Sequence, residues 1–167
     1  MITFLSLQTL PQKQLVGKST RMSLIDNKTP MLWKSFMQER QQIQNAVGTD
    51  LYSLQVYDEL YFDNFNPQTE FTKYALIEVA DFTTIPENME RFTLDSGLYA
   101  TFMYKGLPQN FSEAFQYIFY TWLPNSEYEL DNRPHFEVLG TKYNPTSKAS
   151  EEEIWIPIRK SYTPISS

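Results

Sequence analysis

The chain lacks cysteine altogether, has a single histidine, His135, and contains only five glycines among its 167 residues. The absence of cysteine excludes disulfides, thiolate catalysis and zinc–thiolate sites. One histidine cannot form a histidine-rich metal cluster, so we expect neither a metal nor another cofactor. The sequence also contains no phosphate-binding glycine loop and no Gly-x-Ser-x-Gly motif.

No apolar run approaches the roughly 20 residues that a membrane-spanning helix needs. The N-terminus lacks the basic region, apolar run and small-residue cleavage site of a secretory signal. We therefore expect a cytoplasmic protein that does not bind a membrane. The 20 acidic and 14 basic residues give a net charge of −6. Because contacts to phosphates need a basic surface, we expect no direct binding to nucleic acid.

Hydrophobic residues make up 41% of the chain and aromatic residues 16%, which is enough for one domain with a buried core. The first half begins with a strand over 15–24. Thr29 and Pro30 then suit the N-cap and first position of a helix that ends before Gly48. Strands follow over 51–57 and 71–80, where residues alternate in character.

The second half repeats this order. Strands over 88–94 and 98–105 flank the turn at 95–97, and a helix beginning after Asn110 carries an apolar stripe as far as Pro124. Strands over 134–140 and 153–159 complete it. The pattern predicts an α+β fold in which the order strand–helix–strand–strand occurs twice. We expect a single domain over 1–167, with halves at about 1–82 and 83–160 and a short tail over 161–167.

Two predicted strands each carry a carboxylate in an apolar or aromatic setting, Glu137 and Glu153. Burying such a group is costly unless a positive or hydrogen-bonding group meets it. An acid beside an aromatic wall is what a pocket for a lipophilic cation requires. On the last strand the isoleucines 154, 156 and 158 share one face, so Glu153 and Trp155 point to the other.

Four segments in order resemble one known family: Gly97–Phe102 with Gly106, Trp122–Tyr128, Pro134–Glu137 and Glu153–Ile158. They are similar to the GyrI-like (DNA-gyrase-inhibitor-like) domain, which is also the effector-binding domain of AraC-type and MerR-type bacterial transcription regulators. The resemblance is specific over about 86–160 and looser over about 12–80. No DNA-binding segment precedes it, so we interpret the chain as a stand-alone domain.

The resemblance implies a pseudo-twofold, eight-stranded, curved antiparallel sheet with two helices on one face and a ligand cleft on the other. Glu137 matches the pocket glutamate of the family, and Glu153 and Trp155 match an acid–aromatic pair. The further candidates for the cleft wall are Tyr99, Tyr74, Leu139, Tyr57, Trp33, Phe36 and Phe119.

Each of these residues also has a purely structural interpretation. Glu137 could be a surface residue or pair with Arg133 or Lys142, and Glu153 could belong to a solvated run over 151–153. The helix aromatics fit a core equally well. Tyr74 and Tyr99 are better candidates for the cleft, because each lies in a strand and its hydroxyl prefers a polar end.

The sequence therefore favours a small-molecule-binding protein that captures hydrophobic, cationic ligands for sensing or sequestration, with a link to transcription regulation. A first alternative is a hydrolase of reactive cyclopropane-type electrophiles, in which Glu137 or Glu153 acts as general base. A second is a protein-interaction module of gyrase-inhibitor type. The first two readings use the same carboxylates, so residue identity does not separate them.

Overall fold

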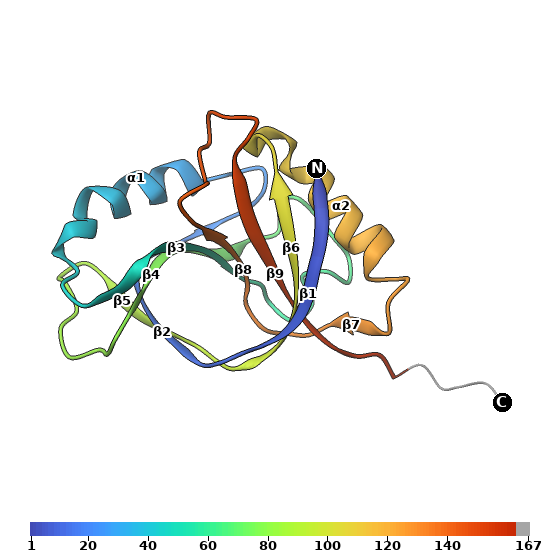
Figure 1. Cartoon of the computed structure of the whole chain (residues 1–167), viewed down its shortest axis with the longest axis horizontal. Helices are drawn as coiled ribbons and strands as arrows, with labels where there is room; N and C mark the ends of the chain where they lie inside the picture. Colours follow the sequence, from blue (N-terminus) through green and yellow to red (C-terminus); the bar gives the residue numbers. More distant parts are fainter. Residues whose placement is uncertain (163–167) are drawn as a thin grey trace.

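The computed structural model describes residues 1–162, so most of the expected tail over 161–167 lies outside the described residues. The described part is an α+β structure of strands and two α-helices (Figure 1). Its elements in chain order are β1 (Ile2–Leu10), β2 (Lys13–Met22), α1 (Thr29–Glu39), η1 (Arg40–Gln42), β3 (Ala46–Val56), β4 (Phe71–Val79), β5 (Glu90–Leu94), β6 (Gly97–Lys105), η2 (Pro108–Asn110), α2 (Phe111–Tyr117), η3 (Ile118–Trp122), β7 (Tyr128–Leu130), β8 (His135–Leu139) and β9 (Glu151–Lys160).

The sheet is antiparallel and pseudo-symmetric about the pairing of β3 with β8. Its strand order is β1-β6-β9-β8-β3-β4-β2-β5, and the short β7 pairs with the end of β9. On one side of the centre lie β3, β4 and β2, and on the other lie β8, β9 and β6. Each trio includes one helix connection, α1 or α2. The expected repeat of strand–helix–strand–strand is confirmed.

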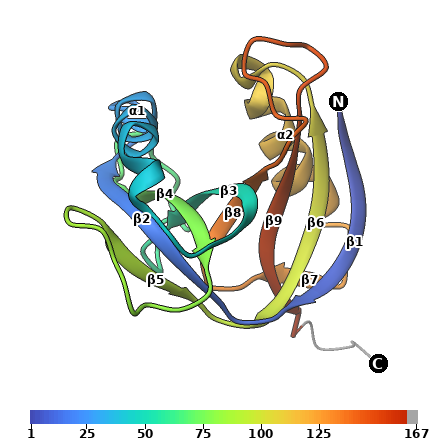
Figure 2. The ribbon, with the colours of Figure 1, turned by 60° about the vertical axis from the view of Figure 1, so that its left-hand side comes forward.

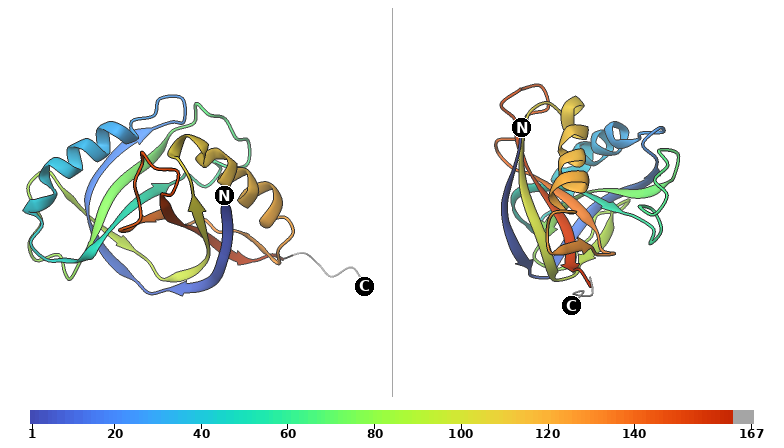
Figure 3. Two further views of the ribbon diagram at one scale, coloured as in Figure 1. Left: turned by 45° about the horizontal axis from the view of Figure 1, so that its top comes forward. Right: turned by 90° about the vertical axis from the view of Figure 1, so that its right-hand side faces the viewer.

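The two halves exchange their leading strands. β1 precedes β2 in the chain but pairs with β6 of the second half, while β5 precedes β6 but pairs with β2 of the first. Only Pro11 and Gln12 separate β1 from β2, although these strands lie near opposite ends of the strand order. The sheet must therefore curl, and Figures 2 and 3 show both crossing connections beneath it.

Both helices pack on the same face of the curled sheet, as expected (Figure 2). Leu32 and Phe36 of α1 contact Ala75 and Ile77 of β4. The α2 and η3 region, with Ala114 and Ile118, packs on apolar residues of β6 and β9, Ala100, Phe102, Ile154, Ile156 and Ile158. The register joins these patches into one continuous face, because Ser53 pairs with both Ala75 and Glu137, and Glu137 pairs with Ile154.

The face away from the helices is a hydrophobic core rather than a cleft. The buried residues on it come from seven strands: Leu10, Leu15, Tyr52, Leu54, Leu76, Leu94, Tyr99 and Phe136. Curling brings these strands around a common interior, which closes that face to a ligand of drug size. The expectation of a cleft on the face opposite the helices is wrong for this reason.

The structure differs locally from the predicted elements in three places. The first strand, β1, was not predicted, because most of its residues are exposed and its pattern breaks at a bulge between Phe4 and Ser6. Thr29 begins α1 instead of capping it, and its N–H donates to Asn27 Oδ1 at 3.0 Å. The second helix changes to a π-helical turn at Ile118.

Among residues 1–162, no helix has the length and apolar character needed to cross a membrane.

Candidate functional site

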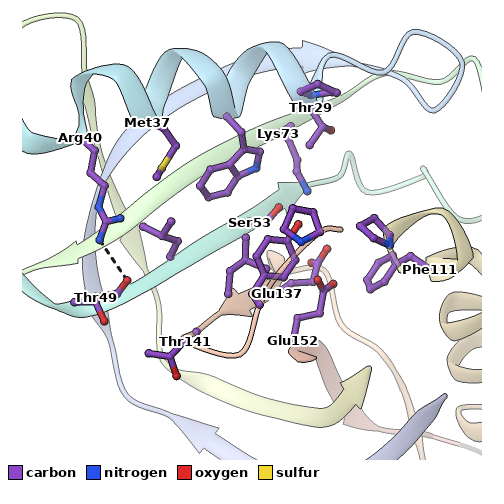
Figure 4. Close-up of a pocket in the computed structure, with 18 of the residues that line it drawn as sticks. Thr29, Met37, Arg40, Thr49, Ser53, Lys73, Phe111, Glu137, Thr141 and Glu152 are labelled. Carbon is purple, nitrogen blue, oxygen red and sulfur yellow. Dashed lines mark hydrogen bonds between the residues drawn. The ribbon is translucent and has the colours of Figure 1, made fainter. Parts of the chain in front are cut away.

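A cavity of about 900 Å³ lies on the helix face, where the two halves meet. Strands β3, β4 and β8 form its floor, α1 forms one wall, and the start of α2 with the loop between β8 and β9 forms the other (Figure 4). Its lining comprises Asn27, Thr29, Pro30, Trp33, Met37, Arg40, Thr49, Leu51, Ser53, Lys73, Pro108, Phe111, Glu137, Leu139, Gly140, Thr141, Tyr143, Pro145 and Glu152. The volume is suitable for a drug-sized ligand.

The walls offer apolar and aromatic surface. Trp33 follows the buried Leu32 of α1, so it flanks the buried side of the helix and reaches the cavity. Its ring packs edge-on against Phe36, with 5.7 Å between the ring centroids. Met37 follows one turn later. Phe111 begins α2 on the opposite wall, where its ring meets Tyr104 edge-on at 5.1 Å.

The floor contains a buried charged pair joined by an amide. Glu137 and Lys73 are only 7% and 6% exposed, and Gln55 between them is 4% exposed. With its amide oriented to satisfy both ends, Gln55 accepts a hydrogen bond from Lys73 Nζ. It then donates to Glu137 Oε2 at 3.1 Å and to the carbonyl of His135 at 3.2 Å. This bridge gives both buried charges a hydrogen-bonding partner, which a buried charge needs.

A second carboxylate, Glu152, approaches the pair from β9. Burial, with the charge of Glu137 second, raises the pKa of Glu152 to about 8, while Lys73 acts against this rise. Burial also raises the pKa of Glu137, opposed by Lys73 and by the hydrogen bond from Gln55. The pKa of Lys73 is lowered by burial. Two carboxylates and one ammonium thus share a poorly solvated floor.

Three of the predicted site residues line this cavity: Glu137, Leu139 and Trp33. Phe36 does not, because it points from α1 into the core with Ala75 and Ile77. Of these two helix aromatics, Phe36 lies wholly in the core, whereas Trp33 packs against the core and also lines the cavity.

Four others lie on the opposite face of the sheet. Trp155 stacks on Phe136 at 5.3 Å, and its Nε1 donates to Glu153 Oε2 at 3.1 Å. Tyr99 is buried in the same core, and Tyr74 packs against it. Because Val138 pairs with Glu153 whereas Glu137 pairs with Ile154, Glu137 and Glu153 point to opposite faces. The expectation that these two carboxylates share one cavity is wrong.

Tyr57 and Phe119 belong to a separate aromatic cluster centred on Phe62. Phe62 stacks on His135 at 5.4 Å and on Phe119 at 5.5 Å, and Tyr57 meets Phe62 edge-on at 4.9 Å. Burial lowers the pKa of His135 to about 3, so the ring is neutral at pH 7. The structure gives this cluster a packing role.

The main residues missed from the sequence are Glu152 and Lys73. Glu152 is the middle residue of a run of three glutamates, and alternation along β9 places it with the isoleucines on the helix face. Lys73 faces the same side as Ala75 and Ile77 on β4, so a lysine in an otherwise apolar alternation was the available signal.

Comparison with known proteins places the chain. Residues 6–158 match the family Cass2, described as integron-associated effector binding protein. The transcriptional regulator BrlR of Pseudomonas aeruginosa is 31% identical over 93 residues, which are 55% of this chain and 34% of the regulator. The chain thus spans about a third of the length of that curated relative.

Solved structures share the fold. SAV2435 bound to tetraphenylphosphonium superposes with a TM-score of 0.73 at 18% identity, covering 93% of each chain. The C-terminal domain of EcmrR superposes with a TM-score of 0.73 at 16% identity, covering 95% of this chain and 99% of the other. The resemblance to GyrI-like effector-binding domains is confirmed, and the chain belongs to the family of integron-associated effector-binding proteins.

Proposed function

We propose that this chain binds a hydrophobic organic cation in the cavity between its helices, with Glu137 and Glu152 as the anchoring carboxylates. The observation that carries the proposal is the presence of two carboxylates and one lysine on the floor of an apolar-walled cavity. Burial raises the pKa of Glu152 to about 8, so this carboxyl is largely protonated at pH 7 when the site holds no ligand. A bound cation lowers that pKa. The floor then has two carboxylates and one ammonium, and the cation balances its net charge of −1.

The walls suit the apolar part of such a ligand. Trp33 and Phe111 present aromatic surface from opposite sides, and Met37 adds a polarisable thioether that adapts to different shapes. A cation beside aromatic rings gains further from the ring quadrupole. Apolar contacts and a negatively charged floor do not require one exact ligand shape. The site therefore favours a class of ligands over a single compound.

Membership of an effector-binding family supports a binding role, and tetraphenylphosphonium, the ligand of the similar SAV2435, is a lipophilic cation of the proposed class. The similarity to BrlR supports a role linked to transcription regulation. The chain has a net charge of −6, whereas contacts to phosphates need a basic surface. We therefore propose that this chain contributes the ligand site and does not itself contact nucleic acid.

Calorimetric titration with tetraphenylphosphonium and tetraphenylborate tests the proposal, because the two ions have similar shapes and opposite charges. We expect the cation to bind and the anion to bind at least about tenfold more weakly. Glu137→Gln keeps the shape and removes the charge, so it should weaken cation binding by about 1–3 kcal/mol, roughly 5- to 150-fold. Glu152→Gln should act in the same direction.

Glu153→Gln is the matched control, since this glutamate lies on the other face of the sheet and should leave the affinity unchanged. Equal affinity for both tetraphenyl ions would contradict the proposal. Turnover of a strained electrophile that Glu137→Gln abolishes, with ligand affinity intact, would instead identify a hydrolase.

A further inference from the structure

A smaller cavity of about 310 Å³ adjoins the main one beneath the end of α1. Met37 and Arg40 line both cavities, so they form the boundary between the two. Beyond them the small cavity is lined by Gln41, Ile43, Ala46, Gly48 and Ile77. The proposed ligand site therefore extends past Arg40.

Arg40 has hydrogen-bond donors at this boundary that are not all used within the protein. Its Nη2 donates to the carbonyl of Thr49 at 3.5 Å, a long contact (Figure 4). Within residues 1–162, no carboxylate lies within ion-pair distance of its guanidinium. A half-buried guanidinium carries five N–H donors in a planar fork that matches a carboxylate or phosphate group. The guanidinium of Arg40 can thus bind an anionic group of a ligand, because no carboxylate among residues 1–162 pairs with it.

Figure 4 shows Arg40 at one end of the site and Glu137 and Glu152 nearer its middle, with Phe111 beyond them. Arg40 contacts Thr49 of β3, and Glu137 pairs with Ser53 of the same strand, four residues along. At about 3.3 Å per strand residue, these two backbone positions are at most about 13 Å apart, because β3 departs from regular pairing between Ala46 and Leu51. The two carboxylates, which share the floor with Lys73, are thus separated along the site from the guanidinium of Arg40.

We propose that the ligand of this site is an elongated zwitterion whose cationic end meets Glu137 and Glu152 and whose anionic end binds Arg40. The inference rests on the proposed function and adds the class of ligand. Arg40 is the residue that determines this specificity, because it is the cationic group at the end of the cavity remote from the two carboxylates. Trp33 and Met37, between the two ends, contact the apolar spacer of the ligand.

The spacing sets the length of the ligand. Allowing ~4–6 Å between a bulky cation and its carboxylate and ~3 Å for the salt bridge to Arg40, a linker of about four methylenes joins the two charged groups. (4-Carboxybutyl)triphenylphosphonium has this arrangement. Pentyltriphenylphosphonium has the same cation and a tail of similar length without the carboxylate.

Calorimetric titration of the full chain with these two phosphonium ions is the test. We expect the carboxylated ion to bind about 5- to 20-fold more tightly than the pentyl ion. In Arg40→Gln, the two ions should bind equally, because the pentyl ion keeps its contacts and the carboxylated ion loses its partner. Lys34→Gln is the matched control, since it removes the same charge from an exposed position on α1.

The outcomes separate the two proposals. Binding of the pentyl ion without any gain from the carboxylate overturns the zwitterion inference and leaves the proposed function standing. A gain that survives Arg40→Gln also overturns it. Failure of both ions to bind contradicts the proposed function and, with it, the inference that depends on it.

Discussion

Gly97 lets Arg133 approach the start of β6 closely, because the side chain of glycine is a single hydrogen. A Cβ atom at Gly97 would lie 2.1 Å from Arg133 Nη1. The guanidinium cannot easily move away, since its Nε donates to Asp131 Oδ2 at 2.7 Å and its Nη2 to the Leu98 carbonyl at 2.6 Å. It also lies over the ring of Tyr99, 4.8 Å from the centroid. The close approach requires glycine at this position.

Gly97→Ala should therefore lower the free energy of unfolding by about 1–3 kcal/mol, the usual cost of overpacking. Urea denaturation measures the effect, and Ser96→Ala, at the exposed neighbouring position, is the control. If the clash with Arg133 is the cause, adding Arg133→Ala should make the glycine substitution nearly neutral. A full loss in both backgrounds would show that the reason lies elsewhere.

Glu152 links the stability of the fold to pH. Its pKa is about 8 in the folded chain, above the usual value of 4.5. The folded state therefore holds a proton between these values that the unfolded state releases. Stability from this group is fully present below about pH 4.5 and is lost as the pH rises through 8. The raised pKa of Glu137 acts in the same direction.

We expect the wild-type free energy of unfolding to fall between pH 5 and pH 8 more steeply than that of Glu152→Gln, in which the proton exchange at this site is absent. Urea denaturation at several pH values measures both slopes, and groups whose pKa does not depend on Glu152 cancel in the comparison. Glu59→Gln, at an exposed loop position, should follow the wild type. Parallel slopes for wild type and Glu152→Gln would refute a buried, proton-holding Glu152.

At the scale of elements, the sequence predicts the alternation of faces within one strand but not the pairing between strands. The sequence correctly separated the isoleucines of β9 from Glu153 and Trp155. Whether Glu137 lies on the face of the isoleucines or on the face of Glu153 depends on the register between β8 and β9. The intervening loop sets that register. A shift of one residue exchanges the faces. Glu152, and not Glu153, consequently lies beside Glu137.

The aromatic residues show a similar limit. Both helices and the strands from β2 to β9, apart from the short β7, were predicted from period and turn residues. Whether Trp33 or Phe36 reaches the cavity depends on how α1 sits on the sheet, because both lie near the apolar side of the helix. The closed core around Tyr99 and Trp155 depends on the curl of the whole sheet. These are tertiary properties that local patterns do not contain.

At the scale of the whole molecule, exchange of β1 and β5 ties the two halves into one unit. Neither half has its full set of paired strands without the other. We expect one cooperative unfolding transition. Trp33 reports on the first half, while Trp122 and Trp155 report on the second, so single-half reporters are made by Trp→Phe substitution. Urea midpoints from the two fluorescence reporters and from circular dichroism should coincide, whereas separate midpoints would show independent halves.

The strand exchange also bears on synthesis at the ribosome. Thr3 of β1 pairs with Met103, about 100 residues later in the chain. At ~5–20 residues per second, the first strand waits ~5–20 s for its partner to be made. During this interval Phe4, Leu5 and Leu7, which stay partly exposed even in the finished fold, have no strand beside them. The nascent chain thus carries an unpaired apolar strand until the second half emerges.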